Sequence, residues 1–435
     1  MGEMLSPLAE KKSPGEWLLD NIVTLIFVAF TLFGFFVSEN VTLPFFLSEL
    51  SSRFFRNTFL VLSLIIPVLA GLGLNFGIVV GAMSGQIAIS IVRYFEMGGA
   101  SGLLTAVVIA FFVSLLCGYF TGLLYNKTRG QEMIASLIVG YFANGIYQFL
   151  FLFVVGVIIT VPATHPMIKP DGIGIRMTVD LVPLENGGLK YALDNIWTIP
   201  FVYALFAVAV GMLIFVAAVW YLNIRKNAAY KNDKRKLIGN LIIIVVLAAV
   251  SIHAIVTESS LLMVRQVPVV TGLLITILCI FTMLITRTKL GQDFRSAGFS
   301  QHVSRVSGIN VDRTRIIATV ISTVLAAWGQ IIYLQNMGTL NTYNAHTQIG
   351  MFSVASLLVG GASTSKANIK NAIFGTLLFN SMFIMSPEIG QSLFGQALLG
   401  EYFRTFMVYG VIGLALGLYV WKAQKNAKAA ALKGN

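Results

Sequence analysis

A basic segment between two apolar runs, Arg287–Arg313, holds the residues best suited to bind a partner at the membrane surface. Its glycines predict two short helices joined by turns: Gly291, Gly298 and Gly308. Apolar side chains stand among the polar ones: Phe294, Phe299, Val303 and Val306. A short amphipathic helix with exposed apolar residues can seat in a groove of a partner protein, or it can lie on lipid headgroups. The pattern leaves both interpretations open.

A second group of residues could line a path through the membrane. Two stretches without a Lys, Arg, Asp or Glu, 57–92 and 316–365, combine glycines with small polar side chains. Glycine-interrupted helices in corresponding positions of two halves mark the pathway of repeat-built transporters. The residues expected to line the path are Asn75, Ser84, Gly85, Gln86, Asn144, Gln348 and Ser353. The alternative is that the small residues serve close helix packing.

The sequence shows no pattern typical of an enzyme. GxxxxGK[ST], HExxH and GxSxG are all absent. The four histidines are scattered, and Cys117 and Cys279 lie in apolar runs without metal or disulfide spacing. We therefore expect no catalytic residue, no metal and no cofactor bound by this chain.

The composition indicates the elements that position these residues. The chain is 57% hydrophobic and 11% charged, and apolar runs of a length that crosses a bilayer recur throughout its 435 residues. We predict an all-α polytopic membrane protein with about twelve spans (ten to twelve) and interrupted helices in two repeat-related halves. The predicted spans are 17–37, 57–75, 76–97, 101–125, 131–158, 198–222, 238–257, 267–287, 313–334, 346–364, 370–387 and 403–421.

The basic residues predict the orientation. In the twelve-span arrangement, 22 of the 30 Lys and Arg fall on the side that carries both termini, which the positive-inside rule makes cytoplasmic. The net charge of +12 is thereby explained by membrane topology, and we expect lipid contacts and no nucleic-acid partner. The outer loop 159–197 is rich in proline and glycine. It could pack on the external mouth, contact a partner or be a passive connector.

The acidic residues bear on the energy source. All 18 Asp and Glu fall in loops or near span ends, whereas proton-coupled carriers generally need an ionisable group within the bilayer. A sodium-coupled carrier that uses carbonyls and hydroxyls stays open. We expect the energy to come from another subunit.

Three segments resemble one family. Gly291, Arg295, Gly298, Gly308, Ile309 and Val311 match a pattern of permeases in the ribose, branched-chain amino acid and nucleoside importer group, with departures at Ser296, Ser300, Val303 and Ser304. The segment from Gln131 resembles the nucleoside and simple-sugar branch at Glu132, Ile134, Tyr141 and Ala143, with Gly140 in place of Asn. Ala355–Ser363 resembles a late segment of the same family, and the likeness runs from about Leu60 to Val420.

The resemblance implies a permease subunit of a type II ABC importer in a bacterial plasma membrane, with one transmembrane domain over 1–435. It implies that 287–313 is the cytoplasmic coupling loop and that 198–257 is a two-span insertion. The expected coupling residues are Phe294, Arg295, Gly298, Gln301, His302, Val303, Val306 and Gly308.

The partners so implied are ABC ATPase subunits that bind the ATP, a second permease subunit and an extracytoplasmic substrate-binding protein. Neutral path residues favour an uncharged solute, a simple sugar or a nucleoside. A riboflavin-like ligand and a stand-alone secondary carrier are the alternatives.

Overall fold

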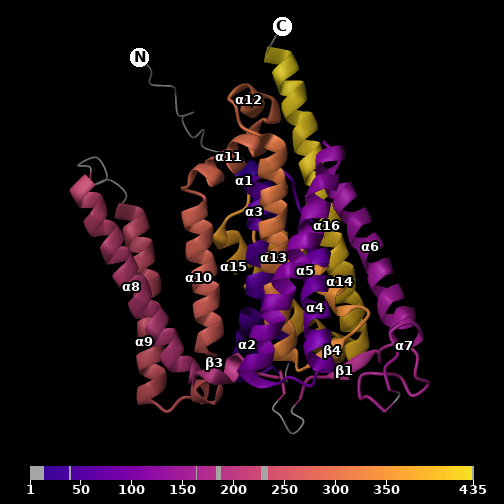
Figure 1. The fold of residues 1–435 in the computed structure, drawn as a ribbon. Helices are drawn as coiled ribbons and strands as arrows, with labels where there is room; N and C mark the ends of the chain where they lie inside the picture. Colours follow the sequence, from indigo (N-terminus) through magenta and orange to yellow (C-terminus); the bar gives the residue numbers. More distant parts are fainter. Residues whose placement is uncertain (1–13, 39–40, 163, 183–187, 227–233, 434–435) are drawn as a thin grey trace.

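The computed structural model describes residues 14–38, 41–162, 164–182, 188–226 and 234–433, and most of them are helical (Figure 1). The first half contains α1 (Pro14–Val37), α2 (Leu43–Ser63), α3 (Ile65–Leu69), α4 (Ile78–Tyr94), α5 (Gly99–Lys127), α6 (Glu132–Phe149), the π-helical turn η1 (Leu150–Val154), α7 (Val155–Val157), β1 (Thr178–Asp180), the 3₁₀ turn η2 (Asp194–Ile196) and β2 (Thr198–Ile199). The second half contains α8 (Phe201–Lys226), α9 (Lys234–Val256), the 3₁₀ turn η4 (Ser260–Met263), β3 (Val267–Pro268), α10 (Val269–Ile285), α11 (Lys289–Phe299), α12 (Gln301–Val306), α13 (Val311–Met337), β4 (Thr339–Asn341), α14 (Ala345–Val359), α15 (Ile369–Phe394) and α16 (Ala397–Lys433).

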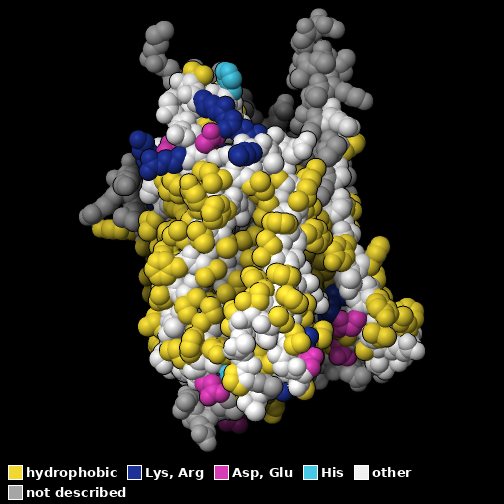
Figure 2. Space-filling view, turned by 45° about the vertical axis from the view of Figure 1, so that its right-hand side comes forward, with side chains coloured by type: hydrophobic (Ala, Val, Ile, Leu, Met, Phe, Trp, Pro, Cys, Tyr) yellow, Lys and Arg dark blue, Asp and Glu magenta, His cyan; other side chains and the backbone are white. Residues whose placement is uncertain are grey.

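The surface of this helical bundle is that of a membrane protein. Figure 2 shows a broad hydrophobic belt between two polar ends, with Lys and Arg gathered at one end of the visible face. Within the described residues, seven helices are long and apolar enough to cross a bilayer, or eight if α10 and α11, bent by 73°, form one span. Each of the twelve predicted ranges contains a helix, but several are short. The helical class is confirmed, and the count of twelve spans and the repeat relation stay predictions.

The core of the bundle forms where α13 packs against α2, α4 and α5. Glycines permit the close approach of α4 and α13. A Cβ at Gly85 would lie 2.3 Å from the carbonyl oxygen of Ala327, and a Cβ at Gly81 would lie 2.5 Å from that of Thr323. These distances leave no room for a side chain, so this part of the glycine-rich stretch serves helix packing.

The two ends of the bundle carry different structures (Figure 1). One end holds α11, α12, the turn between α5 and α6 and the C-terminal part of α16. The other end holds two small antiparallel sheets, in which β1 pairs with β4 and β2 pairs with β3. The loops that the charge pattern predicts to be cytoplasmic and external thus lie at opposite ends, which we call the inner and the outer end.

The described residues of loop 159–197 pack on the outer end of the bundle. Val179 of β1 pairs with Leu340 of β4, and Leu181 N donates to the Gly338 carbonyl at 3.0 Å. The Tyr343 hydroxyl donates to the Ile175 carbonyl at 2.6 Å, and burial raises the pKa of Tyr343 above its ordinary value. Of the three alternatives for this loop, the structure supports packing on the external mouth.

The hairpin of α8 and α9 stands beside α10 at one edge of the bundle (Figure 1). The two helices pack on each other, and both contact η4 at the outer end. Large apolar side chains along α9 are exposed, among them Ile242, Val245 and Ile252. That this hairpin is an insertion, as the family resemblance implies, stays a prediction.

Candidate functional site

The predicted coupling segment forms two short helices, as expected, although Gly291 and Gly298 lie within α11 and only Gly308 follows a helix end. The Thr288 side chain caps α11 by accepting from Gly291 N at 3.3 Å, and the Ser300 side chain caps α12 by accepting from Val303 N at 3.3 Å. Ser and Thr are preferred at this position because they satisfy an orphan backbone donor. The segment 287–313 therefore has the helical order that a docking surface requires.

The side chains of α11 and α12 divide between the protein and the surface. Phe299, Val303 and Val306 are 92%, 59% and 79% exposed at the inner end. Phe294 is 1% exposed, so the prediction that it belongs to the exposed apolar set is wrong. Because α11 packs on α3 and α13, Phe294 points into the core and anchors the helix.

Gly298 is also placed differently from the sequence prediction. It lies within α11, which ends at Phe299 with Ser300 as its C-cap, so Gly298 is not the cap residue. A Cβ at Gly298 would lie 2.4 Å from the Leu69 carbonyl, and Gly71, with φ +73°, faces it from the break after α3. The glycine thus lets α11 rest directly on the interrupted span.

The other predicted coupling residues lie at the surface of the same end. Arg295 donates to the Thr286 carbonyl across the bend between α10 and α11. Gln301 is half-buried, and His302 and Gly308 are exposed. The prediction that these residues contact an ATPase stays a prediction.

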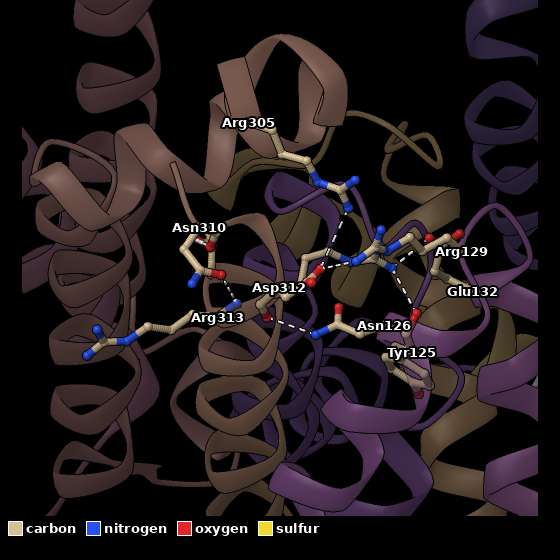
Figure 3. Close-up of polar contacts among 10 residues, drawn as sticks. Tyr125, Asn126, Arg129, Glu132, Arg305, Asn310, Asp312 and Arg313 are labelled. Carbon is tan, nitrogen blue, oxygen red and sulfur yellow. Dashed lines mark hydrogen bonds and ion pairs between the residues drawn. The ribbon is translucent and has the colours of Figure 1, made fainter. Parts of the chain in front are cut away.

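Ion pairs connect this segment to the rest of the bundle (Figure 3). Asp312, at the start of α13, accepts from Arg129 of the α5–α6 turn and lies 3.8 Å from Arg305 of α12. The Asn126 side chain donates to the Asp312 carbonyl at 2.9 Å. A displacement of α12 would therefore act on α13 and on the turn before α6.

The first interrupted stretch breaks as the sequence predicts. Between α3 and α4 the chain leaves the helical conformation, and Asn75 is buried there. Its side-chain oxygen accepts from Gly77 N at 3.0 Å and from the Tyr125 hydroxyl at 2.9 Å. These contacts give Asn75 the role of holding the break in place.

Gln86 and Asn144, two more predicted path residues, belong to a buried polar cluster. The Gln86 amide donates to the carbonyls of Asn341 and Thr342 at 2.9 and 2.7 Å. His346 bridges Gln86 and Asn144, with ring nitrogens 3.2 and 2.8 Å from their side-chain oxygens. This cluster joins α4, α6 and the start of α14. No sequence pattern points to His346, because its two partners, Gln86 and Asn144, are distant in the chain.

A small cavity lies between α2, α13, α14 and α15. Its volume is about 60 Å³, and it is lined by Arg53, Arg56, Asn57, Val61, Tyr333, Ile349, Phe352, Ser353, Ser356, Phe379, Asn380 and Phe383. We call it the inner cavity. Of the predicted path residues, Ser353 lines it; Ser84 and Gly85 are buried in helix packing, and Gln348 is exposed. Its lining includes two arginines, so it is not neutral.

A larger cavity of about 290 Å³, the outer cavity, lies beside it at the outer end. It is lined by Ser52, Tyr191, Asp194, Asn195, Thr198, Arg265, Gln266, Pro268 and Asn336. Asn336 separates the two cavities: its amide nitrogen donates to Asp194 at 2.7 Å, and its amide oxygen lies 3.5 Å from an Arg56 nitrogen. The outer cavity thus lies next to the inner cavity on its outer side, with Asn336 between them.

Comparison with known protein families identifies the family to which this chain belongs. The family of branched-chain amino acid transport system permease components matches residues 184–416, more than half of the chain. The chain belongs to this permease family. The match includes the α11–α12 segment and the late glycine segment that resembled such permeases in the sequence. The chain is accordingly a multi-pass permease of a bacterial cytoplasmic membrane.

Individual permeases show the same relationship over shorter stretches. The chain is 30% identical to the nucleoside ABC transporter permease protein NupB of Lactococcus lactis over 27% of its length and 31% of the relative's. It is 27% identical to the probable ABC transporter permease protein YphD of Escherichia coli, over 38% and 47% of the two chains. It is also 27% identical to the xylose transport system permease protein XylH of Haemophilus influenzae, over 36% and 39%. The matched segments thus cover 31% to 47% of each relative, less than half of its length. No solved structure matches the chain.

Proposed function

We propose that this permease is the membrane subunit of an ATP-driven importer for a small polar solute of sugar or nucleoside size. Separate ATPase subunits would dock on the α11–α12 segment, and an external binding protein would deliver the solute to the outer cavity. A second permease subunit would complete the path. The names of the relatives support the solute class, since they include a nucleoside permease and a xylose permease.

One observation carries the coupling role. Phe299, Val303 and Val306 are exposed at the inner end on a capped pair of short helices, and Arg305 of α12 lies 3.8 Å from Asp312 of α13. A surface of this kind fits a groove of a partner protein. In the described residues, no group of three or more His, Cys, Asp or Glu could hold a metal ion, and the sequence contains no nucleotide-binding loop. The likeness to ABC transporter permeases supports energy supplied by a partner.

The test is a charge placed in this surface. In the purified complex in lipid, Val303→Asp should lower both solute uptake and permease-stimulated ATP hydrolysis, because burial of an unpaired carboxylate in a protein groove is costly. Ser365→Asp adds the same charge to an exposed site at the inner end and should leave both activities near the unmodified level. Full assembly and undiminished uptake with Val303→Asp would contradict the proposal. Uptake without any ATPase subunit would instead identify a stand-alone carrier.

A further inference from the structure

The guanidinium of Arg56 lacks a charged partner although it lies within the candidate span Leu43–Leu69. No carboxylate of the described residues lies within 4.0 Å of it, and its buried Nε has no hydrogen-bond partner. Its contacts are neutral: the Met337 sulfur at 2.8 Å, the Asn336 amide oxygen at 3.5 Å and the Tyr333 ring at 5.4 Å. An ionisable residue within a membrane span is expensive to place there and commonly functional.

The other charges around the inner cavity are paired. Arg53 binds Glu49 at 3.4 Å, and Arg404 binds Glu401 while it stacks over Phe383. The described charges closest to this cavity thus leave one positive charge uncompensated, that of Arg56.

Asp194 is the carboxylate that hydrogen bonds connect to Arg56, but its oxygens already accept from other residues. Asp194 accepts from Thr271 at 2.6 Å and from Asn336 at 2.7 Å, and it reaches Arg56 through the Asn336 amide. The outer cavity in turn carries Arg265, which lies over the Tyr191 ring at 5.1 Å. Lys190 lies 5.3 Å from the same ring. The linings of the two cavities therefore contain three arginines, Arg53, Arg56 and Arg265, against one carboxylate, that of Asp194. This excess of positive charge attracts anions.

We propose that Arg56 binds an anionic group of the transported solute, a carboxylate or a phosphate. The inference rests on the proposed import function and names its solute class: a sugar acid, a sugar phosphate or a nucleotide-like molecule. A guanidinium presents a fork of donors that matches the oxygens of either anion. An anion there would supply the countercharge that the protein does not provide.

The rest of the inner cavity suits the uncharged part of such a solute. The Asn57 side-chain oxygen is buried without a donor, and the Asn57 amide nitrogen donates to Asn380 at 3.0 Å. Phe352, Phe379 and Phe383 pack against one another along the wall in tilted and edge-to-face arrangements, with centroids 4.8 to 5.9 Å apart. A hydroxyl or N–H of the solute would satisfy Asn57, and a ring face would contact the phenylalanines. Ligand pockets usually measure about 300–1,000 Å³, so the inner cavity must widen when a solute enters.

The experiment measures binding to the purified full-length permease in lipid nanodiscs, without ATPase subunits. The probes are matched in size: glucose, gluconate and glucose phosphate, with uridine and uridine monophosphate as a second set. Binding is read from the rise of the unfolding midpoint with probe concentration and from protection of a cysteine at Ser353 against alkylation. We expect an anionic probe to bind and its neutral counterpart to bind at least tenfold more weakly, as loss of a charge-assisted hydrogen bond predicts.

Variants assign this preference to Arg56. Arg56→Gln should raise the apparent Kd of the anionic probe about tenfold or more, and Arg56→Lys should retain part of the affinity. Arg93→Gln is the matched control, because Arg93 is at the outer end, outside both cavities. Preference for gluconate or for a phosphate would identify the anion.

Equal binding of neutral and anionic probes, or binding of none, would overturn the inference. If Arg56→Gln does not fold, two measurements still test whether Arg56 binds the anion. They are the affinity of Arg56→Lys for the anionic probe and the protection of the Ser353 cysteine from alkylation with Arg56 intact. Because no ATPase is present, these outcomes are independent of the coupling test. Failure of anion binding in a permease that still drives ATP-dependent uptake would reject only the solute class.

Discussion

Arg315 Nη2 lies 2.6 Å from Glu132 Oε1 and donates to the Tyr125 carbonyl at 3.2 Å. The Arg315 side chain is 1% exposed and that of Glu132 is 11% exposed. The pair joins the start of α13 to the start of α6 at the inner end, next to the contacts of Asp312 with Arg129 and Arg305 (Figure 3). These charges thus join α12, the α5–α6 turn and the start of α6 to α13, the helix that also lines both cavities.

Removal of one partner of this pair should destabilise the protein. Arg315→Met would leave Glu132 as a largely buried carboxylate without its partner, which costs about 3–5 kcal/mol. The double variant Arg315→Met/Glu132→Leu should recover much of that loss, because no charge is then left unpaired. Unfolding in detergent, measured for both single variants and the double variant, gives the coupling energy. Additive effects would show that the pair contributes nothing as a pair.

Sequence reasoning found the helices but not the partners of their side chains. Hydrophobic length is a local property, so each predicted range contains a helix, although the bounds differ where a span is broken, as between α3 and α4. The positive-inside pattern counts Arg315 as one more cytoplasmic charge, and only the fold brings Glu132 to it. Arg56 was likewise assigned to an external loop, whereas α2 begins at Leu43 and carries it to the wall of the inner cavity. Of the predicted path residues, Ser353 lines the inner cavity, and the role of all of them in a path stays a prediction.

Gly85 is another residue whose packing partner cannot be read from the sequence, and it gives a second prediction. From sequence, a bulky residue there should block a path, but a Cβ would lie 2.3 Å from the Ala327 carbonyl of α13. Gly85→Leu should therefore separate α4 from α13 and lower the unfolding temperature and the yield of folded protein. Gly211→Ala is the control, because no atom lies within 4 Å of its added Cβ. A fully stable Gly85→Leu variant with blocked uptake would restore the path interpretation.

Accessibility from the two sides of the membrane gives a third prediction. With Cys117 and Cys279 replaced, a single cysteine at Met177, which is 56% exposed at the outer end, should react with an impermeant thiol reagent applied to intact cells. A cysteine at Ser300, between α11 and α12, should react only after the membrane is permeabilised. The positive-inside distribution requires this orientation. Labelling of the Ser300 position in intact cells would reverse it.

Two phenylalanines of α11 allow an effect on folding to be distinguished from an effect on coupling, and they give the last prediction. Phe294 is 1% exposed against α3 and α13, whereas Phe299, five residues later, is 92% exposed. Phe294→Ala should cost about 3–5 kcal/mol of unfolding free energy, because it removes a buried ring and leaves a cavity. Phe299→Ala should change stability by less than about 0.5 kcal/mol, as surface substitutions usually do.

The two variants should then differ in function. In the reconstituted complex, Phe299→Ala should reduce permease-stimulated ATP hydrolysis and weaken co-purification with the ATPase while the unfolding midpoint stays unchanged. Phe294→Ala should reduce both activity and stability, and activity per folded molecule should be closer to normal. Were Phe299→Ala to leave ATP hydrolysis and assembly intact, the exposed apolar face would instead rest on lipid headgroups, the alternative that the sequence left open.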